Sequence, residues 1–196
     1  MRRFAGLALA ALAAALFVSP ALAGEERGGI RYFGEFMAPS SDYKVGDTQT
    51  KLTSTLGVGL GAYVKANDWI TIDFDVKFLK PEVRVAANGE VGKKRVRVLP
   101  ITIGPMFHFG DGDWHFYAGP ELAYMNYGKI SEPENVKFKS QLTWGVKAGL
   151  DVPLSQRWSG SVAVEYIDAK MTVDMDGGPD LKPKPVIVSF GATYRF

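Results

Sequence analysis

The sequence contains no cysteine in its 196 residues, and its only histidines are His108 and His115. A fold without cysteine has neither a disulfide nor a thiolate metal site. The net charge is only +2, which argues against a nucleic-acid partner. Beyond the N-terminus there is no apolar run long enough for a membrane-spanning helix, so hydropathy alone would describe the rest of the chain as soluble.

The N-terminus has the parts of a secretory signal peptide. Arg2 and Arg3 form a basic start, residues 4–18 are apolar, and residues 21–23 form an A-x-A cleavage site. We therefore predict that residues 1–23 are a cleavable signal peptide and that residues 24–196 form a single domain. An uncleaved anchor helix is the alternative, but the apolar segment is shorter than the ~20 residues that span a membrane.

The last strand-like stretch, residues 184–196, alternates between apolar and small or polar side chains, which predicts a strand. Its apolar side holds Val186, Val188, Phe190, Ala192, Tyr194 and Phe196. A terminal aromatic residue suits a strand that faces lipid and ends in the aromatic girdle of an outer-membrane barrel. The ending also resembles the C-terminal signature of bacterial outer-membrane proteins, so Phe196 is expected to bring the chain to the barrel-assembly machinery.

Residues 69–78 show the same alternation with charges on one side. Asp73, Asp75 and Lys77 alternate with large apolar residues. A soluble core does not readily bury a charge at nearly every second position, whereas the polar interior of a membrane barrel accepts it. This segment therefore favours a barrel whose apolar side chains point outward.

The pattern predicts about eight strands, which we place at residues 29–38, 51–64, 69–78, 96–109, 114–127, 138–152, 159–166 and 184–196. Short turns near Lys65, Gly110 and Pro153 alternate with longer loops that begin near Pro39, Pro81, Lys129 and Val173. Within the second loop, Asn88-Gly89 is a type I′ hairpin signal. We therefore predict an all-β fold, an eight-stranded antiparallel transmembrane β-barrel of the outer membrane, with short periplasmic turns and outer-membrane lipid around the wall.

A soluble lipocalin-like barrel is the alternative fold, and it would place the apolar residues inside and the charges outside. Nothing in a soluble barrel requires exposed aromatic residues to gather at one end. Here the short-turn end collects Trp69, Phe109, Trp114, Trp158, Tyr194 and Phe196. Glycines at 57, 59 and 61 would face the interior, either to make room for side chains across a narrow barrel or, as we favour, to mark curvature or a bulge.

The inward side of the predicted strands is rich in charges of both signs. It holds Arg31, Glu35, Asp73, Asp75, Lys77, Glu121, Lys139, Lys147, Asp151, Glu165 and Arg195. The lumen of a small barrel is only wide enough for side chains, so these charges are expected to pair and fill it. We expect Asp73, Asp75 and Lys77 to meet Lys147, Lys139 or Glu121. The network has either a purely structural role or a part in transport.

Several segments resemble the OmpW family of small outer-membrane barrels over nearly all of the mature chain. They are WITI at 69–72, LPIT at 99–102 with FHF at 107–109, YAGPELAY at 117–124 and GATYRF at 191–196. Ile101 and Glu121 depart from the family's proline and glycine, and the loops look short. The resemblance implies passage of small hydrophobic molecules into the barrel and sideways into the membrane. A path of this kind would lie near the extracellular rim, lined by Met37, Leu79, Val98, Met125 and Ile167.

Two other functions are compatible with a small barrel. One is a plugged structural or adhesive barrel of the OmpX type, which the charged interior favours and the small amount of predicted β-structure in the loops disfavours. The other is a lipid-modifying enzyme, but the His-x-Ser pattern of lipid A deacylases is missing, since Phe109 and Gly110 follow His108. We therefore expect no catalytic residues, no cofactor and no metal site.

Overall fold

The computed structural model describes residues 27–39, 42–45, 48–87, 90–110, 114–128, 138–173 and 180–196. All regular elements within these ranges are strands. No helix in the described ranges is long and apolar enough to cross a membrane. The predicted signal peptide lies outside the described residues, so its cleavage stays a prediction.

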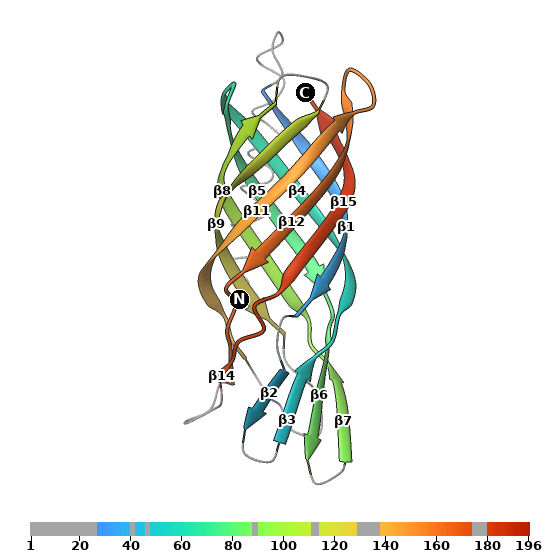
Figure 1. Ribbon diagram of the computed structural model, residues 1–196, viewed down its shortest axis with the longest axis vertical. Helices are drawn as coiled ribbons and strands as arrows, with labels where there is room; N and C mark the ends of the chain where they lie inside the picture. The colour runs from blue at the N-terminus through green and yellow to red at the C-terminus, as the bar shows by residue number, and fades with distance from the viewer. Residues whose placement is uncertain are drawn as a thin grey trace.

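Eight strands close into an antiparallel barrel in the order β1-β15-β12-β11-β9-β8-β5-β4, as Figure 1 shows. They are β1 (Gly28–Ala38), β4 (Thr55–Asn67), β5 (Ile70–Leu79), β8 (Val98–Phe109), β9 (His115–Tyr127), β11 (Gln141–Pro153), β12 (Trp158–Ile167) and β15 (Val186–Arg195). The ring closes where β1 pairs with β15, from Gly29 opposite Arg195 to Ala38 opposite Val186. The predicted eight-stranded antiparallel barrel is confirmed.

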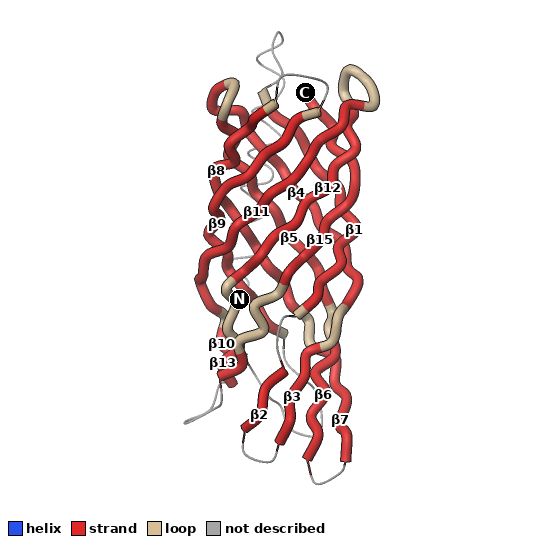
Figure 2. Tube along the Cα trace, viewed as in Figure 1, coloured by secondary structure: helices blue, strands red, loops and turns tan. Residues whose placement is uncertain are grey.

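Further strands extend the barrel at the end opposite the short turns, which we call the extension end (Figure 2). One sheet has the order β2-β3-β6-β7, and a smaller one has the order β10-β13-β14. Their members are β2 (Asp42–Val45), β3 (Thr48–Leu52), β6 (Glu82–Ala87), β7 (Glu90–Arg95), β10 (Phe138–Lys139), β13 (Met171–Val173) and β14 (Asp180–Leu181).

The expectation of loops with little β-structure is therefore wrong in part. The polar segment after Pro39 forms the hairpin of β2 and β3, and β3 pairs with β6. The 81–94 hairpin was predicted correctly: Ala87 pairs with Glu90, which leaves the two residues of the Asn88-Gly89 turn between the strands. Those two turn residues themselves lie outside the described part of the chain.

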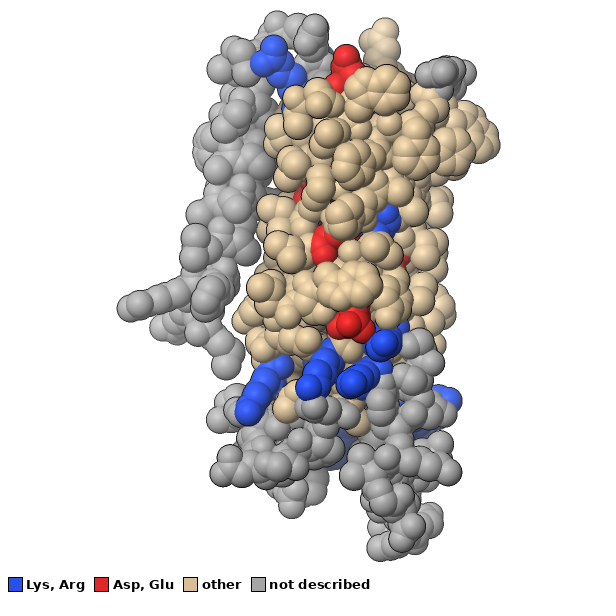
Figure 3. All heavy atoms as spheres, turned by 60° about the vertical axis from the view of Figure 1, so that its left-hand side comes forward, with Lys and Arg blue, Asp and Glu red and all other residues tan. Residues whose placement is uncertain are grey.

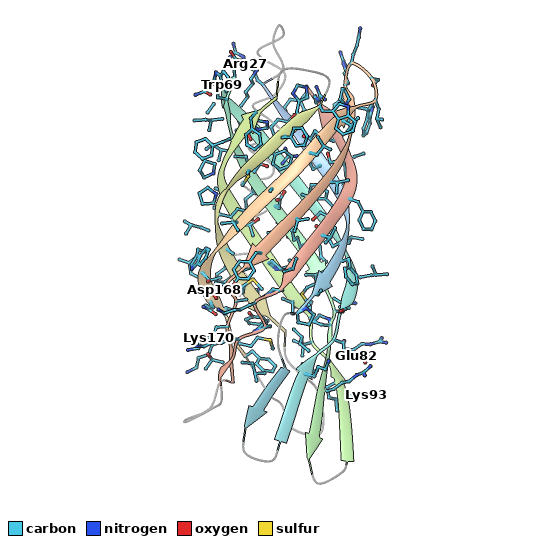
Figure 4. All side chains as sticks on the ribbon, viewed as in Figure 1. Arg27, Trp69, Glu82, Lys93, Asp168 and Lys170 are labelled. Carbon is cyan, nitrogen blue, oxygen red and sulfur yellow. The ribbon has the colours of Figure 1, made fainter. Side chains whose placement is uncertain are left out.

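The wall of the barrel is apolar on its outer side. Large hydrophobic side chains point away from the lumen on all eight strands and remain exposed, among them Leu56, Phe78, Ile103, Leu122, Trp144, Val164 and Phe190. Trp69, Trp114 and Trp158 are exposed beside the short turns, and Figure 4 shows Trp69 there. This facing excludes the lipocalin-like alternative, because a soluble barrel would bury these side chains.

Glycines of β4 make room for carboxylates inside the barrel. A Cβ atom on Gly59 would lie 2.3 Å from an oxygen of Glu35, and one on Gly61 would lie 2.0 Å from an oxygen of Asp75. Both glycines pair in regular register, and the only irregularity of the β4–β5 ladder falls between Lys65 and Asn67. The regular register excludes a bulge at these positions, and the nearby carboxylates support the other explanation, that the glycines make room for side chains.

Candidate functional site: the lumen and its apolar outer end

The middle of the lumen is filled by charged side chains, which we call the polar plug. Among the described residues it holds three buried cations and six buried carboxylates: Arg31, Lys77, Lys147, Glu35, Asp73, Asp75, Glu121, Asp151 and Glu165. Each side chain comes from the inward side of a barrel strand. The plug holds fewer cations than the sequence suggested, because two predicted members, both cations, lie elsewhere.

Those two residues are Lys139 and Arg195. Lys139 is exposed on β10, which belongs to an extension sheet and not to the barrel, so its assignment to the lumen is wrong. The strand predicted at 138–152 is interrupted at Ser140, and the alternation does not continue across that break. Arg195 is only partly buried at the short-turn end, where its guanidinium donates to the hydroxyl of Ser159.

The cations of the plug join strands from different parts of the ring. Arg31 on β1 pairs with Asp73 on β5, and its other nitrogen lies 3.6 Å from Asp151 on β11. The Lys147 ammonium on β11 lies 2.5 Å from Asp75 and 3.5 Å from Asp73. These contacts cross the lumen and fill its middle with paired side chains.

The third cation, Lys77, lies 2.5 Å from Glu165 on β12 and 3.7 Å from Asp75. Of the predicted partners, Lys147 meets both aspartates and lies 4.0 Å from Glu121, whereas Lys77 pairs with an acid that had not been matched to it. The sequence places residues on the inward side of a strand but does not say which of them are opposite each other across the lumen.

Neutral polar residues, which were not among the predicted lumen residues, complete the plug. The hydroxyl of Ser189 donates to Glu35 at 2.5 Å, and that of Ser161 donates to Asp151 at 2.5 Å. Tyr117 is buried with the Arg31 guanidinium 4.8 Å from its ring centroid. All of them occupy inward-facing positions of the strand alternation, as the charged residues do. That alternation is the signal in the sequence that identifies them.

Towards the short turns the plug opens into a pocket of about 170 Å³. It is lined by Tyr63, Lys65, Asn67, Asp68, Thr71, His108, His115, Asp151 and Arg195. Both histidines line this pocket, and a ring nitrogen of His108 lies 2.9 Å from the Thr71 hydroxyl. At its mouth a hydrogen bond from Lys65 lowers the pKa of the Asp68 carboxyl. Within the described residues no group of three or more His, Cys, Asp or Glu side chains is arranged to hold a metal ion.

Towards the extension end the lumen is apolar instead. Met37, Leu79, Val98, Met125 and Ile167 lie together in one buried cluster, each with at most 2% of its surface exposed. We call this the apolar cluster; its other buried members are Leu52, Val83, Val96, Ala123, Tyr127, Ala169, Met171 and Ile187. The five residues predicted for a hydrophobic path thus lie in one cluster, although they come from five barrel strands spread over more than a hundred residues of chain.

The ladder between β5 and β8 is interrupted beside this cluster. Pairing runs from Ile70 opposite Phe107 to Val76 opposite Ile101 and resumes at Leu79 opposite Val98. At even-numbered positions of this segment the amides point to β5, since His108 donates to Trp69 and Val96 to Pro81. The same direction at position 100 would reach the carbonyl of Lys77, but proline has no N–H to donate.

The whole chain resembles a known class of membrane barrels. A family model described as outer membrane protein beta-barrel domain matches residues 8–196. The chain belongs to this outer-membrane barrel family. It is therefore a protein of the outer membrane that crosses the bilayer with its strands. No curated protein is similar enough in sequence to count as a relative.

Solved structures with the same fold include small members of this class. The crystal structure of OprG from Pseudomonas aeruginosa has a TM-score of 0.76 at 17% identity, covering 87% of this chain and 96% of that one. The structure of AlkL in lipid bilayers has a TM-score of 0.62 at 18% identity, covering 90% and 94%. OmpW of E. coli has a TM-score of 0.61 at 18% identity, covering 89% and 100%. The expected likeness to OmpW is confirmed in the fold of this outer-membrane barrel.

Proposed function

We propose that this barrel takes up small hydrophobic molecules from outside the cell into the apolar cluster and releases them sideways into the membrane between β5 and β8. The observation that carries the proposal is the position of the cluster. It fills the lumen at the extension end, and it lies beside the one interruption of the β5–β8 ladder. Met37 and Met125 give this cluster adaptable thioether side chains, which suit apolar ligands of varied shape.

An axial route through the barrel does not fit an apolar molecule. The polar plug lies on the short-turn side of the cluster, and Lys77, two residues before Leu79 on β5, is already paired with Glu165. Parting such a buried pair leaves charges unpaired in a dry interior, at a cost of about 3–5 kcal/mol. A molecule that enters the cluster from outside therefore meets less resistance at the wall than along the axis.

The wall is thin where the ladder is interrupted. Leu79 and Val98 belong to the apolar cluster, and on the adjacent outward positions Phe78 and Leu99 face the membrane, Phe78 with 50% of its surface exposed. At this level the backbones of β5 and β8 are not paired, since the ladder lacks the contact between Pro100 and Lys77. Only side chains therefore separate the cluster from the membrane here. A small separation of β5 and β8 here would connect the cluster with the acyl chains of the lipid.

The test is uptake of a fluorescent hydrophobic probe, N-phenylnaphthylamine, by cells that express the wild type or Pro100→Ala. Alanine supplies the N–H that the ladder lacks, so we expect the variant to fold and to lose most of the uptake. Pro120→Ala is the control. Pro120 faces Pro105 in the β8–β9 ladder, where a Cβ on Gly119 would come within 1.9 Å of the Pro105 carbonyl, so that interruption is closed by backbone contact.

Two results would reject the proposal. Equal uptake by Pro100→Ala and the wild type would show that molecules do not leave the barrel between β5 and β8. Uptake no greater than in cells without the barrel would favour a plugged structural barrel of the OmpX type instead. Heat-modifiable migration of each variant in gels shows in both cases whether the barrel has folded.

A further inference from the structure

The outer face of β5 and β8 continues beyond the membrane wall without a change of register. Leu79 pairs with Val98 in the barrel, and Glu82 pairs with Arg95 in the β6–β7 hairpin, so the same residues stay opposite each other throughout. By this register the successive outward positions are Phe78 and Leu99, Lys80 and Arg97, Glu82 and Arg95, and Arg84 and Lys93, and the last two of these pairs are formed in the β6–β7 ladder. The lipid-facing stripe therefore passes directly into a ladder of charged residues.

This ladder is strongly basic. Residues 80–97 contain six cations and two carboxylates. Five of the cations lie on the outward face, and we call them the cationic ladder: Lys80, Arg84, Lys93, Arg95 and Arg97. Arg84 and Arg95 share one carboxylate, that of Glu82, at 3.7 and 3.6 Å. Figure 4 shows Glu82 and Lys93 projecting from the outer side of the hairpin where it leaves the barrel.

The opposite face of the hairpin fixes the direction of these side chains. Val83 and Val96 are buried in the apolar cluster with 5% and 0% of their surfaces exposed, so the alternate positions must face outward. Two of the outward pairs, Lys80 with Arg97 and Arg84 with Lys93, oppose like charges. Like charges directly opposite each other destabilise a strand pair. An anion held between them would turn this repulsion into attraction.

The height of the ladder indicates which anion that is. The Lys80–Arg97 pair is two residues beyond Phe78 and Leu99, about 7 Å along the strand from the end of the apolar wall. The next two pairs lie about 7 and 14 Å further out. Figure 3 brings forward the side of the barrel away from this hairpin, and there too lysine and arginine side chains lie in a row at the extension end, directly below a wall with few charges. The ladder thus occupies the headgroup layer of the lipid.

We propose that the cationic ladder binds the phosphate groups of a phosphorylated glycolipid in the outer leaflet, with the acyl chains of that lipid against Phe78 and Leu99. Arginine forms paired hydrogen bonds with phosphate, and basic residues beside an apolar membrane surface attract anionic headgroups. The site lies on the outer wall, so it is separate from the lumen and does not depend on the proposed transport function.

The test measures binding of purified lipid A that carries two phosphates, using the folded full-length barrel in detergent. The test variant is Arg84→Gln with Lys93→Gln and Arg97→Gln. The control is Arg27→Gln with Lys65→Gln and Arg157→Gln, which removes the same charge from exposed cations at the short-turn end. We expect the test variant to bind at least about 10-fold more weakly and the control to bind as the wild type does.

Phosphatase-treated lipid A distinguishes phosphate recognition from binding through the acyl chains. We expect the wild type to bind the dephosphorylated lipid about as weakly as the test variant binds intact lipid A. Equal affinity for both lipids would overturn the proposal, and so would an equal loss of binding in the control. Tight binding of inorganic phosphate by the wild type, at the affinity of lipid A, would identify an anion site without a role for the lipid. Heat-modifiable migration confirms that all the proteins compared are folded.

Discussion

The side chain of Lys147 is the cation with the most partners in the polar plug. Its ammonium group lies 2.5 Å from Asp75, 3.5 Å from Asp73 and 4.0 Å from Glu121, and the residue has only 3% of its surface exposed. Carboxylates outnumber cations in the plug, and the other two cations, Arg31 and Lys77, already pair with acids. Neither can take the place of Lys147. Loss of this charge would leave several carboxylates close together without compensation.

We expect Lys147→Met to destabilise the barrel by about 3–5 kcal/mol, and by less if water enters the lumen. Methionine has a similar volume, so the effect reports the charge and not a cavity. The measurement is the midpoint of urea unfolding in detergent. Lys93→Met is the matched control, because Lys93 is exposed on β7 and its replacement should leave the midpoint unchanged. A harmless Lys147→Met would indicate a hydrated lumen.

Lys139 and Lys147 show how far residue-level prediction reaches. Both were placed in the lumen because they share one alternation, and the structure keeps only Lys147 there. The alternation holds as long as a strand is unbroken, as in β5, where Thr71, Asp73, Asp75 and Lys77 are all buried. The break between β10 and β11 depends on which strand each segment pairs with, and that information is not local in the sequence.

At the scale of one element, each strand of the wall passes through layers of different polarity. On β12 Val164 faces outward in the middle of its ladder, opposite Val188 on one side and Ala148 on the other, with 48% of its surface exposed. On β11 Leu150 faces outward close to the short-turn end, and Leu154 lies in the turn itself with 70% exposed. The three positions sample different depths in the lipid.

Substitution by arginine should therefore cost less stability the nearer the residue lies to the interface. We expect Val164→Arg to cost about 2–4 kcal/mol and Leu154→Arg about 0–1 kcal/mol, with Leu150→Arg between them. The measurement is unfolding in lipid vesicles of fixed composition. Equal costs at all three positions would show that the outer face of the barrel is not in contact with lipid.

The end of β15 closes the ring against β1. The amide of Phe196 donates to Gly28 at 3.0 Å, and Arg27 donates to the carbonyl of Phe196 at 3.1 Å. Deletion of Phe196 removes both bonds together with the terminal aromatic side chain. We expect lower assembly into the outer membrane, measured as the heat-modifiable fraction, with export unaffected. Phe109→Ala removes another exposed aromatic at the same end and should assemble normally. Normal assembly of the truncated chain would count against a role for Phe196.

The extension strands explain why prediction was weaker outside the barrel. Barrel strands such as β5 separate lipid from lumen, so each carries an alternation that is visible in the sequence. Residues 48–52, which form β3, read Thr-Gln-Thr-Lys-Leu and have almost no apolar side. Their pairing with β2 and β6 comes from backbone hydrogen bonds, which any sequence can form. Only the Asn88-Gly89 turn gave a local signal there.

For the whole molecule, the two ends predict its orientation in the membrane. The short turns and the C-terminus lie at one end and the extension sheets at the other. Because the chain has no cysteine, a single introduced thiol is a unique label. We expect a membrane-impermeant maleimide to label Lys93→Cys in intact cells and Ser155→Cys only after lysis. The reverse labelling pattern would show that the barrel has the opposite orientation in the membrane.

The network within the plug has a consequence for the order of folding. Its contacts join residues far apart in the chain, with Arg31 and Asp73 separated by 42 positions, Asp75 and Lys147 by 72, and Glu35 and Ser189 by 154. The contact of Glu35 with Ser189 forms only once the ring closes, because it joins β1 to β15, the first and last strands of the barrel. We expect such a contact to be absent from the transition state for assembly, so that breaking it accelerates unfolding without slowing folding. The plug thus sets how long the finished barrel survives, while the alternating strands set how fast it is made.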